Sequence, residues 1–104
     1  MTNIYEDAAD LIEKGWCQYS FGDDDGGYCT VGAVNKTISD SAISCSPVRV
    51  IEMAKGLREF DPSLREYDPG DEFSFVTNWN DDPTRDRQEV LDFLRFMGKK
   101  EADK

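Results

Sequence analysis

The sequence predicts one small, mainly α-helical domain of four to five short helices. Three observations lead to this prediction. The chain has 104 residues, the usual size of a single domain. Apolar residues recur at helical spacing in several segments, and residues that favour helix ends flank those segments. We expect the helical domain to span residues 1–98 and residues 99–104 to form a charged tail.

The first helix is expected over residues 4–14. Asn3 is a preferred N-cap residue, and Glu6 stands three positions later, as in a capping box. Gly15 favours a helix end in the left-handed conformation, and Trp16 is then expected to fold back into the core. The predicted buried face consists of Ala8, Leu11 and Ile12.

The middle of the chain contains two further candidate helices. Residues 29–38 fit either a helix or a strand, and we favour a helix because their apolar residues recur at its spacing. These apolar residues are Val31, Val34 and Ile38. After a polar loop at residues 39–46, Pro47 is well suited to the first turn of a helix that extends to about Phe60. The predicted buried face of that helix consists of Val50, Ile51, Ala54 and Leu57.

Residues 73–79 leave the choice between strand and helix open. Their alternation fits a short strand near residues 73–78, and a helix capped by Asp71 is the alternative. The apolar face of that helix would consist of Phe75, Val76 and Trp79.

The last helix is expected to begin after Thr84, a good N-cap residue, and to end near Met97, before Gly98. Its inward face would contain Val90, Phe93, Leu94 and Met97. Leu91 and Phe96 widen this apolar face. The extra width indicates either a central position in the core or a contact with a second copy in a homodimer.

The charge of the chain is strongly negative, with 22 acidic and 12 basic residues and a formal net charge of −10. A field of this sign repels nucleic acid and anionic membranes, and it favours basic partners, divalent cations or solubility alone. We therefore expect a basic partner protein and no direct binding of nucleic acid or membrane. The candidate partner-binding acids are Asp23, Asp24, Asp25, Asp71, Glu72, Asp81 and Asp82.

The acidic residues and cysteines match no metal-binding motif. When Gly26 is aligned with the turn glycine of an EF-hand, Phe21 falls at the first ligand position and Gly32 at the last. The cysteines include no pair at the close spacing that structural zinc sites usually have. We expect no metal and no cofactor, and free thiols at Cys17, Cys29 and Cys45. With no apolar leader and no run approaching the ~18 apolar residues of a membrane span, a cytoplasmic location is expected.

The residue types exclude several enzyme classes. The chain has no histidine, which removes the commonest general base at neutral pH and every histidine-dependent triad. The GxSxG, GxGxxG and Walker patterns are absent as well. Only chemistry based on carboxylates or a bound metal would remain for an enzyme, so a non-enzymatic role is favoured.

Three short motifs resemble those of an uncharacterised family of small bacterial and bacteriophage proteins. They are GW-Q at residues 15–18, C-x-x-G-A at residues 29–33 and WND-P-x-R at residues 79–85. The resemblance covers most of the chain and implies one helical domain with tight packing at Gly32 and Ala33. It transfers no activity and no catalytic residue.

The turn after Trp79 has two interpretations. In the first, the indole packs in the core and Asn80 or Asp81 satisfies free backbone amides before the last helix. In the second, the turn forms a surface pocket with Tyr19 nearby. The pocket residues would be Gln18, Asn80, Asp81 and Arg85.

The leading functional hypothesis is a non-enzymatic inhibitor or modulator, encoded by a phage or other mobile element, that binds a basic partner in the host cytoplasm. Nucleic-acid mimicry is one form of this hypothesis, in which carboxylates occupy sites built for phosphates. An anti-CRISPR or anti-restriction protein that acts on a nucleic-acid-binding complex would work in this way. The alternatives are a small carboxylate- or metal-dependent enzyme and a self-associating module.

Overall fold

Five α-helices make up most of the chain that the structure describes. The structure is a computed structural model that describes residues 3–19, 27–39 and 47–103. The helices are α1 (Ile4–Lys14), α2 (Thr30–Ser39), α3 (Pro47–Phe60), α4 (Glu72–Asp81) and α5 (Arg87–Ala102). The described ranges contain no β-strand, and Trp16 and Tyr28 form an isolated parallel bridge. The mainly α-helical fold class is confirmed.

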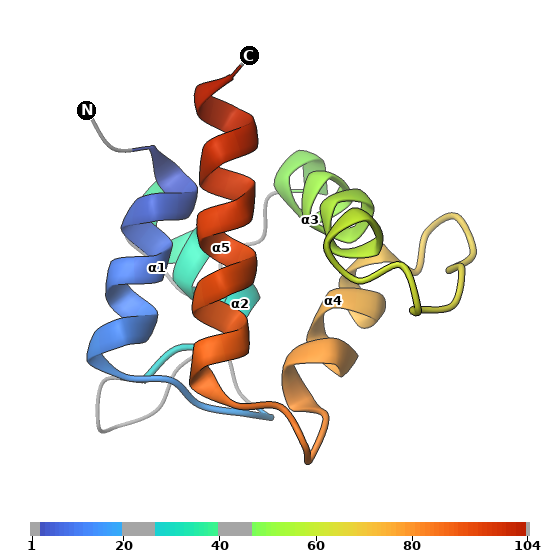
Figure 1. The fold of residues 1–104 in the computed structure, drawn as a ribbon, viewed down its shortest axis with the longest axis horizontal. Coiled ribbons are helices and arrows are strands. Elements are labelled where there is room, and N and C mark those ends of the chain that lie inside the picture. Colours follow the sequence, from blue (N-terminus) through green and yellow to red (C-terminus); the bar gives the residue numbers. More distant parts are fainter. Residues whose placement is uncertain (1–2, 20–26, 40–46, 104) are drawn as a thin grey trace.

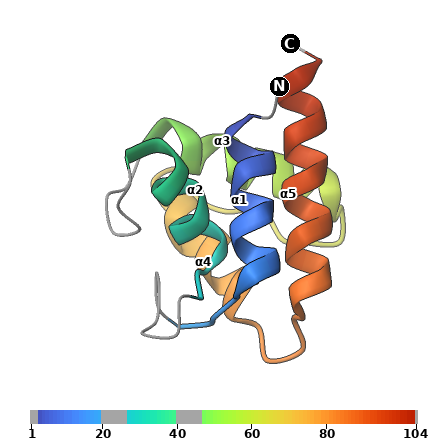
Figure 2. The same cartoon turned by 90° about the vertical axis from the view of Figure 1, so that its left-hand side faces the viewer.

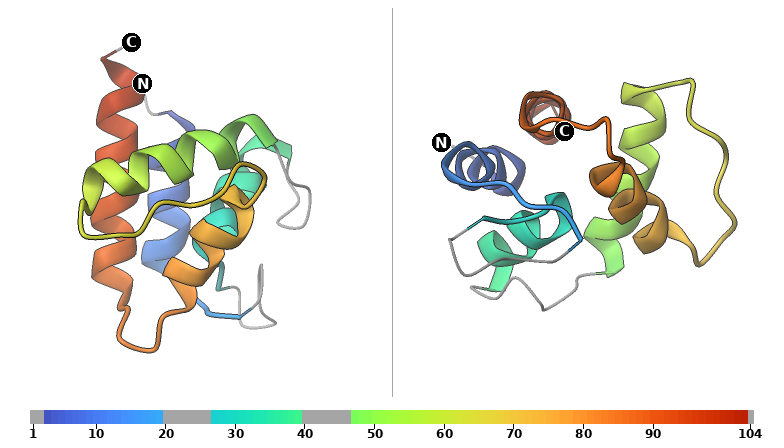
Figure 3. Two further views of the ribbon diagram at one scale, coloured as in Figure 1. Left: turned by 90° about the vertical axis from the view of Figure 1, so that its right-hand side faces the viewer. Right: turned by 90° about the horizontal axis from the view of Figure 1, so that it is seen from below.

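The two terminal helices lie side by side and run in opposite directions (Figure 1). α1 also packs against α2, as Figure 2 shows, and α3 packs against α4. Figure 3 shows α3 crossing the α1–α5 pair at a steep angle. The beginning of α1 and the end of α5 therefore lie at one end of the molecule. The opposite end, which we name the loop end, consists of residues 15–19, 27–29 and 82–86.

The core collects buried side chains from all five helices. Trp79 is 5% exposed, and its ring packs against Phe60 and Phe93 with centroid separations of 6.5 and 5.3 Å. The prediction that this indole lies in the core is confirmed. The largest fully buried apolar side chains are Tyr5, Ile12, Met53, Leu57, Phe93 and Leu94.

Two predicted core residues are exposed instead. Ile38 is 44% exposed and Ile51 is 38% exposed. The buried positions of α3 follow the i, i+3, i+4, i+7 pattern of a single helical face, which places Ile51 at the edge of that face. These buried positions are Val50, Met53, Ala54 and Leu57.

The start of α1 agrees with the prediction and its end does not. Asn3 caps the helix, because its Oδ1 accepts hydrogen bonds from the amides of Tyr5 and Glu6, both at 3.1 Å. Gly15 ends the helix in an extended conformation, with φ −175° and ψ 129°, so the expected left-handed cap is wrong. The reason is that the Gly15 carbonyl accepts a hydrogen bond from the Tyr28 amide at 3.0 Å, which directs the chain straight into the bridge.

α4 occupies the segment for which a short strand near residues 73–78 was the alternative, and that alternative is wrong. Val76, Trp79 and Asn80 are buried at i, i+3, i+4 spacing, whereas Phe73 lies on the outer face and is 36% exposed. The helical period therefore decides the structure of this segment.

The N-cap of α5 is Asp86, which corrects the prediction of Thr84. The Asp86 carboxylate accepts from the Glu89 amide at 2.8 Å, and the Glu89 carboxylate accepts from the Asp86 amide at 3.3 Å. This is a complete capping box. Thr84 lies in the preceding turn, where its amide and hydroxyl donate to Asp82 Oδ1 at 2.8 and 2.7 Å.

Gly98 does not end α5, which continues to Ala102. The expected tail at residues 99–104 is therefore helical to residue 102. Gly98 is buried where α1 approaches closely, since a Cβ atom there would lie 2.7 Å from Glu6 Cγ. Its carbonyl also accepts a hydrogen bond from Asn3 Nδ2 at 2.8 Å. The glycine permits contact between two helices and is not a stop signal.

The wide apolar face of α5 is covered within the chain. Leu91 is 7% exposed, and the Phe96 ring lies 5.5 Å from the Phe60 ring on α3. The central position of α5 accounts for this width, so the width no longer argues for a second copy.

Candidate functional site

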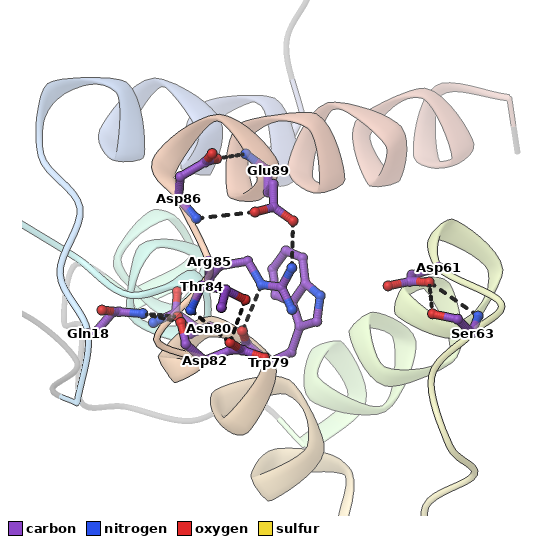
Figure 4. Close-up of polar contacts among 10 residues, drawn as sticks. All are labelled: Gln18, Asp61, Ser63, Trp79, Asn80, Asp82, Thr84, Arg85, Asp86 and Glu89. Carbon is purple, nitrogen blue, oxygen red and sulfur yellow. Dashed lines mark hydrogen bonds and ion pairs between the residues drawn. The ribbon is translucent and has the colours of Figure 1, made fainter.

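The three sequence motifs meet at the side chain of Asn80, near the loop end. The first motif follows α1, the second begins α2, and the third joins the end of α4 to α5. Figure 4 shows the third motif with Gln18 of the first beside it. Segments far apart in the sequence are therefore tied together at one point.

Asn80 is fully buried and bonds to each of these segments. Its Oδ1 accepts from the Trp16 indole N–H at 2.9 Å and from the Thr30 amide and hydroxyl at 3.0 and 2.7 Å. Its Nδ2 donates to the Cys17 carbonyl at 3.2 Å and to Asp81 Oδ1 at 3.0 Å. Asn80 thus satisfies a free amide at the start of α2, and not before the last helix as predicted.

Gln18 and Tyr19 are fixed by the same turn. Gln18 Nε2 donates to the carbonyls of Asn80 and Asp82 at 3.0 and 2.8 Å. The Tyr19 amide donates to Asp81 Oδ1 at 2.8 Å. Tyr19 has a φ of 65°, in the left-handed region, and its side chain is 72% exposed. A bulky residue rarely adopts this backbone conformation, so the surrounding hydrogen bonds hold it there.

The Arg85 side chain stacks on the indole ring of Trp79 and covers this part of the core. Its guanidinium lies 4.2 Å from the centroid of the indole ring, and its Nε donates to the Trp79 carbonyl at 2.9 Å. Its Nη1 pairs with Glu89 Oε2 at 2.6 Å, and the side chain is only 11% exposed. The cation is therefore neutralised and stacked within the fold.

The structure brings the four predicted pocket residues together, but as a hydrogen-bonded cluster. Gln18, Asn80 and Arg85 direct their polar groups at neighbouring carbonyls and side chains (Figure 4). Two hollows formed by described residues lie elsewhere. One, of about 230 Å³, lies between Tyr5, Gly56 and Met97, and the other lies between α1 and α2.

The predicted partner-binding acids fall into separate groups. Asp71 and Glu72 lie at the beginning of α4, and Asp81 and Asp82 lie at its end, about 15 Å away for a helix of this length. Hydrogen bonds from the amide and hydroxyl of Thr84 lower the pKa of the Asp82 carboxyl. The remaining candidates, at positions 23–25, lie outside the described residues.

The two described cysteines, Cys17 and Cys29, form no disulfide. Cys17 is half-buried, and Cys29 is 4% exposed. Burial raises the pKa of Cys29 to about 11, partly opposed by a hydrogen bond from the Gly32 amide. Among the described residues, no three carboxylates or thiols are grouped so that they would hold a metal ion. Cys45 lies outside the described ranges.

The sequence did not indicate two members of the cluster, Thr30 and the indole N–H of Trp16, which both donate to Asn80. One local signal points to Thr30. Cys29 stands at the N-cap position of α2, and cysteine is a weak N-cap residue. The amide of Thr30, the first of α2, therefore needs another hydrogen-bond acceptor. No local signal indicates that the acceptor is Asn80.

Comparison with known proteins gives a family for this chain. None of the helices in the described part is long and apolar enough to span a membrane. No curated protein and no solved structure matches the sequence. A family model does match, over residues 1–99, and on this match the chain belongs to the family of unknown function DUF6197.

Proposed function

We propose that the chain is a non-enzymatic interaction protein that binds a basic partner protein through its loop end. The observation that carries the proposal is Tyr19, a 72% exposed aromatic residue in a left-handed backbone conformation. Such strain costs roughly 1–3 kcal/mol and persists where the surroundings fix it, most often at functional sites. Gln18 and Asp81 supply this fixation.

A fixed, exposed tyrosine is well suited to be the anchor of an interface. Tyrosine is enriched among the residues that contribute most to binding, because it buries a large area at a small cost in side-chain entropy. The hydrogen bond from the Tyr19 amide to Asp81 holds the backbone from which the ring projects. The backbone position from which the ring projects is therefore set before a partner arrives, which lowers the entropy lost on binding.

The charge around Tyr19 argues for a basic partner. The Tyr19 amide donates to Asp81, while Asp82 and Asp86 follow in the turn before α5 (Figure 4), and the chain as a whole carries a formal net charge of −10. The acidic run at positions 23–25 lies between Tyr19 and Gly27 in the sequence. Complementary charge increases the association rate and selects partners of opposite sign.

The narrower form of the proposal is a phage- or mobile-element-encoded inhibitor of the anti-CRISPR or anti-restriction type. In this form, carboxylates of the loop end occupy positions that phosphates of a nucleic acid would take on a basic complex in the host cytoplasm. The negative charge and the resemblance to small bacterial and bacteriophage proteins support this form.

The test is the affinity for a partner that is captured from a host lysate, identified and purified. We expect Tyr19→Ala to weaken binding about tenfold or more, which corresponds to the loss of one interface anchor. The matched control is Val48→Ala, on α3, whose side chain is 65% exposed, and it should leave the affinity unchanged. If the chain is a nucleic-acid mimic, duplex DNA should compete with it for the same site on the partner.

Measuring the affinity at two salt concentrations separates the contribution of charge from that of the Tyr19 ring. Asp82→Asn should weaken binding in about 0.05 M salt and have little effect in about 0.5 M, where screening is strong. Asp10→Asn, on the exposed face of α1, is the control for loss of one charge. If the affinity changed neither with the salt concentration nor with the Tyr19→Ala substitution, the proposal would be refuted. Capture of only the chain itself, unaffected by salt, would support a self-associating module in its place.

A further inference from the structure

The bridge after α1 brings the segments that carry two cysteines side by side. The Cys17 amide donates to the Tyr28 carbonyl at 3.1 Å, and the Tyr28 amide donates to the Gly15 carbonyl at 3.0 Å. This is the pattern of a parallel pair in which Trp16 faces Tyr28. The next residues on the two segments are Cys17 and Cys29, where the Asn80 carboxamide replaces the direct backbone pairing. The two thiols are close enough that Cys17, after burial, contributes to the raised pKa of Cys29.

The spacing of such a pair suits a covalent link. At the Trp16–Tyr28 bridge the segments are paired, and paired segments lie about 4.8 Å apart, while disulfides join Cα atoms that are about 4.4–6.8 Å apart. Successive side chains point to opposite sides of an extended segment, so we expect Cys17 and Cys29 on the side opposite Trp16 and Tyr28. Neither cysteine forms a disulfide in this structure.

We propose that Cys17 and Cys29 form a reversible intramolecular disulfide when the protein meets a low-molecular-weight disulfide of the glutathione type. This inference does not depend on the proposed function, because it concerns the chemistry of two thiols within the chain. It assigns an oxidative modification site to the segment that precedes α2.

The two thiols have different roles in the exchange. Cys17 is half-buried and reacts first, whereas Cys29 is 4% exposed and its burial raises its pKa to about 11. The Cys17 thiolate attacks one sulfur of the reagent, the reagent S–S bond breaks, and one small thiol leaves. Cys29 then attacks Cys17 Sγ, which forms the internal S–S bond and releases the second small thiol.

The exchange balances without a further reactant. Two cysteine thiols are oxidised, one reagent disulfide is reduced, and the two thiol protons end on the two small thiols. Excess reduced thiol reverses the reaction. The Gly32 amide, which donates to Cys29 Sγ at 3.2 Å, stabilises the transient thiolate at the start of α2.

The experiment uses the full chain with Cys45→Ser, so that Cys17 and Cys29 are the remaining cysteines. The folded protein is incubated with oxidised glutathione and its intact mass is measured. We expect the loss of two hydrogens without a lasting glutathione adduct. Cleavage before the aspartates at positions 23–25 should then give two peptides that remain joined until they are reduced.

Two single variants in the same background separate the roles. Cys29→Ser keeps a residue suited to the N-cap position and should accumulate one glutathione on Cys17. Cys17→Ser should stay reduced over the same time. The closed loop should also raise the midpoint of thermal unfolding of the parent protein by about 5 °C or more.

Two outcomes would overturn the inference. One is a parent protein that keeps glutathione on Cys17 and never forms the internal bond. The other is oxidation that occurs only after the protein is unfolded in urea. Partner binding by the Cys17→Ser variant tests the proposed function separately, so each idea can fail without the other.

Discussion

Asn80 gathers three hydrogen-bond donors on one buried oxygen. Asn80→Ala would leave the Trp16 indole N–H and both Thr30 donors without that acceptor. Each buried donor left unpaired costs about 1–3 kcal/mol, so we expect the free energy of unfolding to fall by roughly 3 kcal/mol or more in a urea titration.

The control for this change is Asn78→Ala, on the exposed side of the same helix. It should change the free energy of unfolding by less than about 0.5 kcal/mol. If the two variants were equally stable, Asn80 would not be the link between the loops.

Tyr19 allows the backbone contribution to be separated from that of the ring. Glycine adopts the left-handed conformation without steric cost, so Tyr19→Gly should raise the free energy of unfolding by about 1 kcal/mol. It should nevertheless weaken partner binding as strongly as Tyr19→Ala, which keeps the backbone strain. Calorimetric unfolding of the two variants checks the difference, and a less stable glycine variant would contradict it.

At the next scale, the beginning of α5 depends on Asp86. We expect Asp86→Ala to lower the free energy of unfolding by about 1 kcal/mol, the usual effect of losing an N-cap. Thr84→Ala should cost less than about 0.5 kcal/mol, because it removes only a hydroxyl from an exposed turn. Thermal unfolding of both variants provides the measurement. If Thr84→Ala lowered the free energy of unfolding more than Asp86→Ala, Thr84 and not Asp86 would be the N-cap of α5.

Helix boundaries were predictable where the chemistry that sets them is local. Asn3 caps α1 through the next amides in the chain, and Pro47 begins α3 as its fixed φ suggests. Gly98 has the same local pattern as a stop signal, yet its role is set by Glu6 on another helix. Local reasoning also missed Asp86, because Thr84 offered an equally good cap two residues earlier.

The members of the hydrogen-bonded cluster were predictable only in part, and their arrangement was not. The motif residues Gln18, Asn80 and Arg85 were expected to be neighbours, and they are. Their hydrogen bonds run to carbonyls and side chains from distant segments, such as Trp16 and Thr30, and no periodicity in the sequence encodes those pairings. The burial of Asn80 follows only from the packing of α4 against the core.

Over the whole molecule, the last turn of α5 ties the terminal helix to α3. Lys100 pairs with Glu59, and Glu101 lies 3.5 Å from Arg49. Deleting residues 99–104 removes both pairs, and partly exposed ion pairs are each worth about 0–1 kcal/mol. We expect a loss of about 1 kcal/mol in low salt that shrinks as salt is added.

Lys99→Ala is the control for this deletion, because Lys99 lies in the same turn with an exposed side chain. Urea titrations at two salt concentrations distinguish the deletion from the control. A deletion without effect in low salt would mean that these residues are a dispensable tail after all.

The antiparallel pairing of α1 and α5 also determines where the molecule can be tagged or immobilised. The beginning of α1 and the end of α5 both lie at the end opposite the loop end (Figure 1). A fusion protein, biotin or bead attached beyond either helix would leave the loop end, with Tyr19, accessible to a partner in solution. Immobilised protein prepared in this way offers any binding partner the same orientation in every copy.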